Sequence, residues 1–341
     1  MAEQRHTAEE LKQWQALPLE VKVGMTMTRI RQWVNEFCED GVYISFSGGK
    51  DSMVLSHLVD RVFPGNQIPR LFVNTGLEFP EIVQFVKKEP RAVIVRPQMN
   101  FKQIIQRWGY PMISKQASKC ISEAKNGGKT GTNKLKGING YEHSKYSLVK
   151  WNAFLRDDSP KVSSYCCNIM KKQPAHRYDK ETGRVPMTAE QARESQQREQ
   201  QWMNHGCNGF DLKHPKSTPM AFWTENDVLQ YIKENGIQIA SVYGDIVADT
   251  RNENVAYGQM RIEDFLGGEC KLRTTGCTRT GCMFCGYGCH LEKPGEGRFL
   301  RMKHTHPKLY EYIMKPWSDG GLGYKEVIDW INEHGGFHIE Y

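Results

Sequence analysis

The sequence lacks any apolar run near the roughly 18–20 residues that a bilayer-spanning helix needs. Its first residues, Met1 to Glu20, are polar and mixed in charge, without the apolar stretch of a secretory signal. The Walker pattern Gly-x-x-x-x-Gly-Lys-Ser/Thr is also missing, so the usual machinery for γ-phosphate transfer is not indicated. These absences favour a cytoplasmic protein with no membrane partner.

Cysteine, in contrast, is abundant, with ten residues in a chain of 341. Cys166 and Cys167 are adjacent, and the chain has a dense group later on, formed by Cys270, Cys277, Cys282, Cys285 and Cys289. A reducing compartment opposes structural disulfides, and clustered cysteines in cytosolic enzymes more often bind metal or do redox work. The pattern predicts a metal or iron–sulfur site, with free buried thiols as the alternative.

Short apolar runs alternate with helical patterns in the first third of the chain. Strands are predicted at residues 42–46, 70–74 and 92–96, and helices at 52–59, 80–88 and 101–108. This rhythm predicts an α/β fold with a doubly wound, mostly parallel sheet. Ligands of such sheets bind beyond the carboxyl ends of the strands. Ser47 and Asn74 both follow strand ends, so we expect them to share one site.

We expect three segments along the chain. Residues 1–40 form a helical segment, residues 41–257 a nucleotide-binding α/β domain, and residues 258–341 a cysteine-rich metal-binding segment with a final helix. Residues 115–150 hold eight lysines against two glutamates, among many glycines, and are predicted to form a mobile basic loop. Such a loop is a solvated insertion, a lid over phosphates or a nucleic-acid contact.

The segment Ser47-Gly-Gly-Lys-Asp-Ser52 lies between a predicted strand and a predicted helix. Gly48 and Gly49 permit backbone conformations that turn successive N–H groups inward, and they leave room for phosphates. The helix N-terminus adds unpaired amides and the positive end of its dipole. The hydroxyls of Ser47 and Ser52 and the charge of Lys50 complete a predicted phosphate-binding site.

This segment resembles the signature of the PP-loop ATP pyrophosphatases, whose members grip the pyrophosphate and typically form an adenylate at the α-phosphate with magnesium. The resemblance implies an adenine nucleotide α-hydrolase-like fold, ATP and Mg²⁺ as ligands, and catalytic roles for Lys50, Asp51 and Ser52. Further segments resemble the PAPS (3′-phosphoadenylylsulfate) reductase-like branch: Asn74-Thr-Gly-Leu-Glu-Phe-Pro-Glu81, Tyr165-Cys-Cys-Asn-Ile-Met-Lys-Lys-Gln-Pro174, Ala192-Arg-Glu-Ser195 with Arg198, and the tryptophan-plus-helix element at 219–228. They imply nucleotide-binding roles for Asn74, Thr75, Gly76, Glu194, Ser195 and Arg198.

The sequence departs from this branch in three places. Ala189 stands where the family usually has glycine, which puts a tight backbone approach there in doubt. The reactive cysteine that reductases carry in a Glu-Cys-Gly-Leu/Ile-His motif has no counterpart after Cys289. The phosphate loop, which those reductases often degrade, is intact here. The last two departures favour ATP activation over sulfonucleotide reduction.

Sulfonucleotide reductases that hold a [4Fe–4S] cluster use a tandem Cys-Cys and a distant Cys-x-x-Cys, and this sequence resembles both. Five candidates therefore compete for four iron positions: Cys166, Cys167, Cys277, Cys282 and Cys285. A Cys₄ zinc site is the alternative.

We expect an ATP-dependent sulfur-transfer enzyme that adenylates its acceptor. The candidate partners are a nucleic acid or another polyanion as acceptor, and a sulfur-donor protein. A PAPS or adenylylsulfate reductase and a non-catalytic nucleotide-binding partner protein are the alternatives. The sequence leaves the oligomeric state open.

Overall fold

The computed structural model describes residues 5–249 and 271–341, which form two compact units, each assembled from separate stretches of chain. The first unit contains Met1–Asn74, Glu78–Val95 and Ala175–Thr280, and the second contains Thr75–Leu77, Arg96–Pro174 and Gly281–Tyr341. These boundaries differ from the three predicted segments, because the N-terminal helices belong with the sheet and the second unit draws on both the middle and the end of the chain. None of the described helices is long and apolar enough to cross a membrane.

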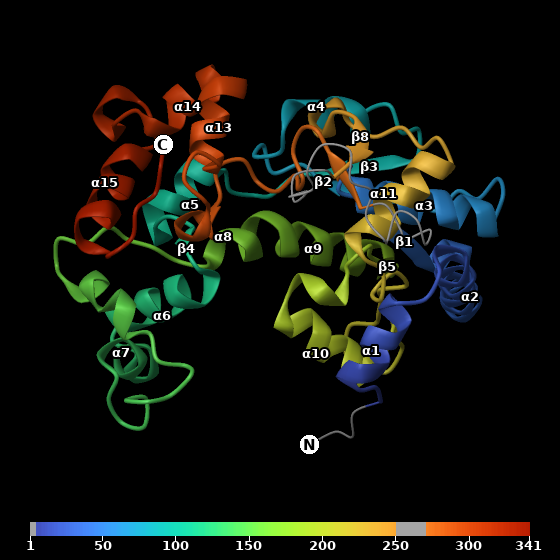
Figure 1. Cartoon of the computed structure of the whole chain (residues 1–341), viewed down its shortest axis with the longest axis horizontal. Helices are drawn as coiled ribbons and strands as arrows, with labels where there is room; N and C mark the ends of the chain where they lie inside the picture. Colours follow the sequence, from blue (N-terminus) through green and yellow to red (C-terminus); the bar gives the residue numbers. More distant parts are fainter. Residues whose placement is uncertain (1–4, 250–270) are drawn as a thin grey trace, which may run out of the picture. The chain divides into compact units, whose positions relative to one another are not determined.

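A six-stranded sheet forms the centre of the first unit (Figure 1). Its strands, in spatial order, are β3 (Ala92–Val95), β2 (Arg70–Val73), β1 (Val42–Ser45), β5 (Val185–Met187), β7 (Lys216–Ser217) and β6 (Asn208–Gly209). All pairs are parallel except β6 with β7. In the register, Ile44 lies opposite Arg70, and Val73 lies opposite Val95. The predicted α/β fold with a mostly parallel sheet is confirmed.

Helices flank this sheet, and their ends follow from local chemistry. They are α1 (Ala8–Gln15), α2 (Leu19–Phe37), α3 (Lys50–Val62), α4 (Pro80–Val86), most of α9 (Gln173–Thr182), α10 (Gln196–His205) and α11 (Glu225–Glu234). Thr7 caps α1 in a capping box, and Pro18 separates α1 from α2. Thr224 and Asp227 form a capping box at the start of α11. Helix α10 begins at Gln196, directly after its N-cap Ser195.

The core of the first unit lies between the sheet and these helices. Ile44 and Phe46 from the region of β1 pack with Val54, Leu55 and Leu58 of α3, all nearly inaccessible to solvent. Burial of such side chains contributes about 1.5–3 kcal/mol each. The two elements that bracket residues 47–49 are therefore fixed by apolar packing. A separate antiparallel pair, β8 (Ile246–Ala248) and β9 (Leu272–Thr274), completes this unit.

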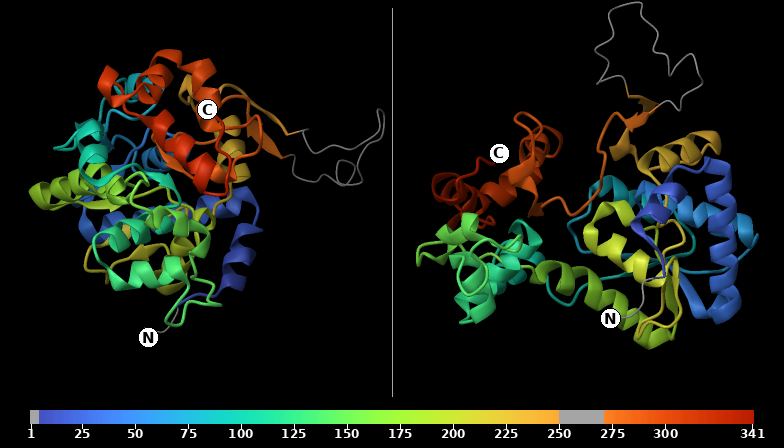
Figure 2. Two further views of the ribbon diagram at one scale, coloured as in Figure 1. Left: turned by 90° about the vertical axis from the view of Figure 1, so that its left-hand side faces the viewer. Right: turned by 60° about the horizontal axis from the view of Figure 1, so that its bottom comes forward.

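The second unit is mainly helical. It contains α5 (Phe101–Trp108), α6 (Lys115–Lys125), α7 (Lys129–Lys136), η2 (Val149–Leu155), α8 (Tyr165–Cys167), η3 (Asn168–Lys172), α13 (Arg298–Thr305), α14 (Pro307–Met314) and α15 (Tyr324–His334). The last three, drawn in orange to red, pack together (Figure 2). A two-stranded parallel sheet joins β4 (Met112–Ile113) to β10 (Gly286–Tyr287).

Most of residues 115–136 of the predicted basic loop are helical instead, because α6 and α7 form a packed pair there. Ala117, Ile121 and Leu135 supply buried apolar positions. Gly131 allows the two helices to approach, since a Cβ at that position would lie 2.4 Å from the carbonyl oxygen of Cys120. The glycines that indicated a loop therefore include one that close helix packing requires.

Candidate functional site: a phosphate loop and a cysteine pocket

Residues 47–52 lead from the end of β1 into the first turn of α3, as the sequence predicts. Gly49 is the N-cap of α3 and has no side chain of its own to cap the helix N-terminus. Gly48 has φ of +70°, and a Cβ there would lie 2.5 Å from Cγ2 of Val86 in α4. Both its left-handed backbone and its close approach to α4 require glycine.

The serine hydroxyls brace this loop from within. Ser47 Oγ accepts a hydrogen bond from the Gly49 N–H at 3.2 Å, and it lies 3.2 Å from Ser52 Oγ. The Ser52 hydroxyl donates to the carbonyl oxygen of Gly49 at 2.8 Å. The backbone of the loop is therefore held in shape by the same side chains that were predicted to face phosphates.

Lys50 is buried, with a side chain only 4% exposed. Its Nζ donates to the carbonyl oxygen of Thr278 at 2.8 Å and lies 3.4 Å from Glu225 Oε1 and 3.8 Å from Asp51 Oδ2. A buried ammonium requires such partners, because desolvation penalises an unpaired charge. The charge of Lys50, at the N-terminus of α3, is thus offset by the carboxylates of Glu225 and Asp51.

A short segment of chain covers the loop, and we call residues 275–280 the closing segment. Its backbone is bonded to η5 (Ser241–Tyr243) by Gly276 N–H to Tyr243 O at 2.8 Å and Cys277 N–H to Val242 O at 2.9 Å. The Tyr243 hydroxyl accepts the Lys50 N–H at 3.2 Å and pairs with Thr280 Oγ1 at 2.6 Å. A backbone amide of the loop that could bind phosphate therefore has a tyrosine hydroxyl as its partner.

Tyr243 keeps its proton at neutral pH. Burial raises the pKa of Tyr243 to about 12, although its hydrogen bonds to Thr280 and to the backbone of Lys50 act in the opposite direction. The neutral phenol accepts from the loop amide without adding negative charge there. Sequence reasoning missed Tyr243, Thr278, Thr280 and Glu225, whose positions far along the chain carry no local signal.

Gln191 connects two of the predicted motifs. Its Nε2 donates to Asp51 Oδ1 at 2.8 Å, and its backbone N–H donates to Glu194 Oε2 at 3.1 Å. Glu194 in turn pairs with Arg198 and lies 3.6 Å from Arg279 of the closing segment. The predicted residues Asp51, Glu194 and Arg198 thus belong to one hydrogen-bonded network, and Gln191 is its centre.

The remaining predicted nucleotide residues lie elsewhere. Ser195 caps α10 by accepting from the Arg198 N–H at 3.3 Å, so its hydroxyl has a structural role. Asn74 directly follows β2, the strand next to β1, and its N–H donates to Val95 O at 2.9 Å. Thr75 and Gly76 belong to the second unit.

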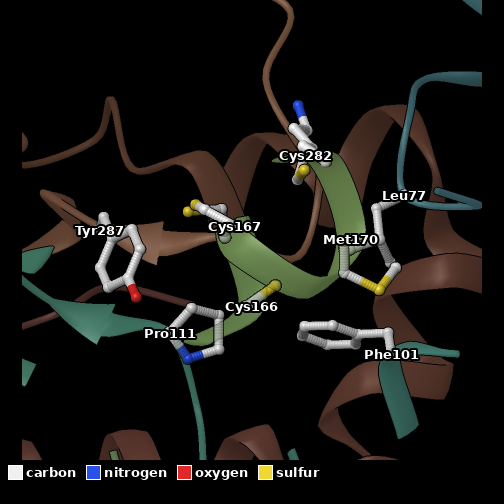
Figure 3. Close-up of a pocket in the computed structure, with 10 residues that line it drawn as sticks. Leu77, Phe101, Pro111, Cys166, Cys167, Met170, Cys282 and Tyr287 are labelled. Atoms are coloured by element: carbon white, nitrogen blue, oxygen red, sulfur yellow. The ribbon is translucent and has the colours of Figure 1, made fainter. Parts of the chain in front are cut away.

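Four cysteines line one pocket within the second unit. Cys166 and Cys167 come from α8, and Cys282 and Cys285 come from the segment before β10. Figure 3 shows Cys166, Cys167 and Cys282 around this pocket together with apolar side chains, and Lys171 also lines it. The tandem Cys-Cys and the distant Cys-x-x-Cys therefore meet in space.

The thiols influence one another. Burial raises the pKa of Cys166 well above its ordinary value, and the neighbouring Cys282, Cys167 and Cys285 raise it further, whereas Lys171 opposes them. Among the described residues, no three Cys, His, Asp or Glu side chains are grouped so as to hold a single metal ion. Several thiolates in this apolar pocket would need a cationic centre to offset their charge.

The family can now be identified from the whole sequence. The profile of the phosphoadenosine phosphosulfate reductase domain matches residues 41–120 and 129–287, which is more than half of the chain. The chain belongs to this PAPS reductase domain family. The phosphate loop lies in the first matched stretch, and the four pocket cysteines lie in the second.

Two individual proteins are also similar to this PAPS reductase family member. An uncharacterized protein of Methanocaldococcus jannaschii, MJ0973, is 35% identical over an 83-residue alignment, with coverage of 22% of this chain and 20% of that protein. The chain thus spans about a fifth of that relative's length. The crystal structure of PAPS reductase from Candida auris in complex with phosphate aligns with a TM-score of 0.38 and 16% identity, over 69% of this chain and 90% of that one.

Cys277 and Cys289 do not line the pocket of this PAPS reductase family member. Cys277 is buried in the first unit, within the closing segment. Cys289 is buried in the second unit, and its thiol donates to Gly286 O at 2.7 Å. Cys270 lies outside the described residues. The structure therefore groups four of the five predicted ligands and leaves Cys277 out of that group.

Proposed function

We propose that this PAPS reductase family protein is an ATP pyrophosphatase-type enzyme that cleaves ATP between its α- and β-phosphates and adenylates an acceptor. The observation that carries the proposal is the intact loop, in which Lys50 and two glycines lie at a helix N-terminus whose N-cap residue has no side chain. Such a cradle suits the β- and γ-phosphates of ATP, which PAPS lacks.

In this proposal the loop amides and Lys50 bind the departing pyrophosphate. An acceptor oxygen attacks the α-phosphorus and loses its proton to solvent, and the bond from that phosphorus to the bridging oxygen breaks. Pyrophosphate leaves with the electron pair, and the positive groups of the loop offset its charge. The carboxylate of Asp51 is the candidate ligand for Mg²⁺, which when bound would supply further positive charge to the departing pyrophosphate.

In this proposal, a bound nucleotide must displace Tyr243 and the closing segment from their contacts with Lys50. The Lys50 ammonium is held by Thr278, and its amide is held by Tyr243, so incoming phosphate oxygens compete with both. A phosphate replaces a neutral carbonyl and a neutral hydroxyl with charged acceptors, which form roughly twofold stronger hydrogen bonds. The stronger hydrogen bonds therefore favour a polyanionic ligand over the carbonyl and hydroxyl groups that it displaces.

We also propose that the four-cysteine pocket holds a [4Fe–4S] cluster. The donor set fits, because iron–sulfur clusters are held by four thiolates in apolar surroundings. A Cys₄ zinc site suits the pocket less well. Zinc–sulfur bonds of about 2.3 Å would require the sulfurs to lie about 3.8 Å from one another, and in the part of the chain that the structure describes no three such side chains are grouped so as to hold a single metal ion. When bound, the cluster would hold or deliver sulfur for transfer to the adenylated acceptor.

The experiment is ATP–pyrophosphate exchange with anaerobically purified protein across candidate acceptors. We expect acceptor-dependent exchange that is lost in Gly49→Val, because a Cβ at residue 49 already lies 3.0 Å from the Tyr243 hydroxyl and the added methyls reach the phosphate position. Gly24→Val is the matched control, since a Cβ there meets nothing within 4 Å.

A second candidate function is sulfonucleotide reduction, which the family match favours. It predicts release of sulfite from PAPS or adenylylsulfate with a thiol reductant and without ATP. Sulfite release at a substantial rate, together with no exchange for any acceptor, would replace the proposed activity with this one.

A further inference from the structure

Most of the chain's excess positive charge lies in one short stretch. Residues 115–150, which we call the basic hairpin, contain eight lysines and two glutamates, a formal charge of +6. The whole chain of 341 residues carries +7, so the rest is nearly neutral. A concentration of one sign on one folded element indicates an anionic partner.

The structure presents this charge to solvent. Seven of the eight lysines are exposed: Lys115, Lys119, Lys125, Lys129, Lys136, Lys145 and Lys150. Lys119 lies 3.7 Å from Glu123, and Lys125 donates to Ser159 O at 3.0 Å. The other five, within the described residues, form no ion pair. Their charge is therefore available to an incoming ligand.

Aromatic rings lie among these lysines. Tyr146 is 51% exposed, and Lys145 Nζ lies 5.2 Å from the centre of its ring. Lys134 Nζ lies 5.5 Å from the centre of the Tyr141 ring. An exposed ring beside cationic side chains is the combination with which proteins bind single-stranded nucleic acids, because bases stack on the ring while the lysines contact phosphates.

We propose that the basic hairpin binds single-stranded nucleic acid, with phosphates on its lysines and a base on Tyr146. A membrane surface fits less well, because α7 turns Leu135 into the interior and presents lysines outward. The inference does not rest on the ATP chemistry, since the phosphate loop and the basic hairpin belong to different units.

The test is fluorescence anisotropy with labelled single strands of about 30 nucleotides, longer than the sites of known single-strand binders. If four phosphates are contacted, affinity should fall about 50-fold between about 50 and 200 mM salt. The variant K129Q/K136Q/K145Q/K150Q should lose most of this binding and lower the slope of affinity against salt by about 3.

The control variant K12Q/K87Q/K88Q/K233Q removes four exposed lysines of the first unit and should bind as the wild type does. Equal weakening in both variants would overturn the proposal, because net charge alone would then explain binding. Circular dichroism melts establish that both variants fold.

Tyr146→Ala should weaken binding to single strands at least about fivefold and leave binding to inorganic polyphosphate unchanged, and Tyr146→Phe should restore it. Equal effects of Tyr146→Ala on both probes, or tighter binding to anionic lipid vesicles than to nucleic acid, would refute the inference. Gly49→Val should keep full nucleic-acid binding, so a failure of the ATP proposal is distinguishable from a failure of this one.

Discussion

Replacing Gly48 by alanine tests whether the phosphate loop is held by its packing against α4. Gly48 has φ of +70°, and its missing Cβ would lie 2.5 Å from Val86 Cγ2 and 3.0 Å from Ile82 Cγ2. Ordinary carbon–carbon contacts are about 3.5–4.0 Å. Val86 and Ile82 are buried and β-branched, so their side chains have little freedom to move away.

A matched substitution separates the two costs. Gly65 has a similar φ of +78°, but a Cβ there meets nothing within 4 Å. Gly65→Ala should therefore cost only the left-handed backbone, about 1–2 kcal/mol. Gly48→Ala should cost this amount and an overpacking penalty of about 1–3 kcal/mol. The difference between the two variants measures the close approach of the loop to α4.

Urea denaturation measures the free energy of unfolding of each variant, and calorimetric titration measures the affinity for ATP. We expect Gly48→Ala to be the less stable variant by about 1–3 kcal/mol and to bind ATP at least tenfold more weakly, because the shifted amides no longer converge. Gly65→Ala should bind ATP normally. If the two variants have the same stability and the same ATP affinity, the loop does not depend on this contact and the reasoning fails.

Three other predictions concern separate parts of the molecule. Without ATP, Tyr243→Phe should lower the free energy of unfolding by about 1–3 kcal/mol. With saturating ATP the loss should be smaller, because phosphate then takes the place of the hydroxyl. Thermal melts that show the same loss of stability with and without ATP would contradict this. Anaerobic Cys282→Ser should lose the brown colour and the iron expected of the wild type, whereas exposed Cys38→Ser should keep both; zinc without iron would support the structural-metal alternative. Burial acts to raise the pKa of Asp60, but Arg91 and Arg70 outweigh it and hold that pKa below its ordinary value. The ionised Asp60 carboxylate therefore stabilises the fold above the ordinary carboxyl pKa, and this stabilisation is lost as the pH falls through the depressed pKa. Between about pH 5 and 2, the free energy of unfolding should therefore fall less steeply for Asp60→Asn than for the wild type.

Local patterns predicted the parts of the fold that local forces set. The strands β1 to β3 and the helices α3, α4 and α5 depend on residues close in sequence. The helices α6 and α7 were missed for the opposite reason. Their glycines and lysines are typical of a loop, and only the contact of Gly131 with the carbonyl of Cys120 explains a glycine inside a helix.

The site divides in the same way. The phosphate loop could be predicted because strand, glycines and helix are contiguous. Tyr243 and Gln191 contact it from 193 and 140 residues away, and no spacing in the sequence indicates this. Cys277 looked equivalent to Cys282 because only four residues separate them. The chain passes from the first unit to the second at Gly281, so these two cysteines belong to different units.

Because the chain passes from the first unit to the second at Gly281, this residue joins the closing segment directly to the segment that contains Cys282. Thr280 pairs with the tyrosine hydroxyl on the phosphate loop, Cys282 lines the cysteine pocket, and Gly281 alone separates them. If phosphate displaced Tyr243 as we propose, Thr280 would lose its hydrogen bond to that hydroxyl. The two backbone torsions of Gly281 would then be the first that could change in response. A glycine resists such rotation less than any other residue. Gly281→Pro would restrict these torsions, and comparing its iron content with that of the wild type, with and without ATP, would show whether they matter to the cysteine pocket.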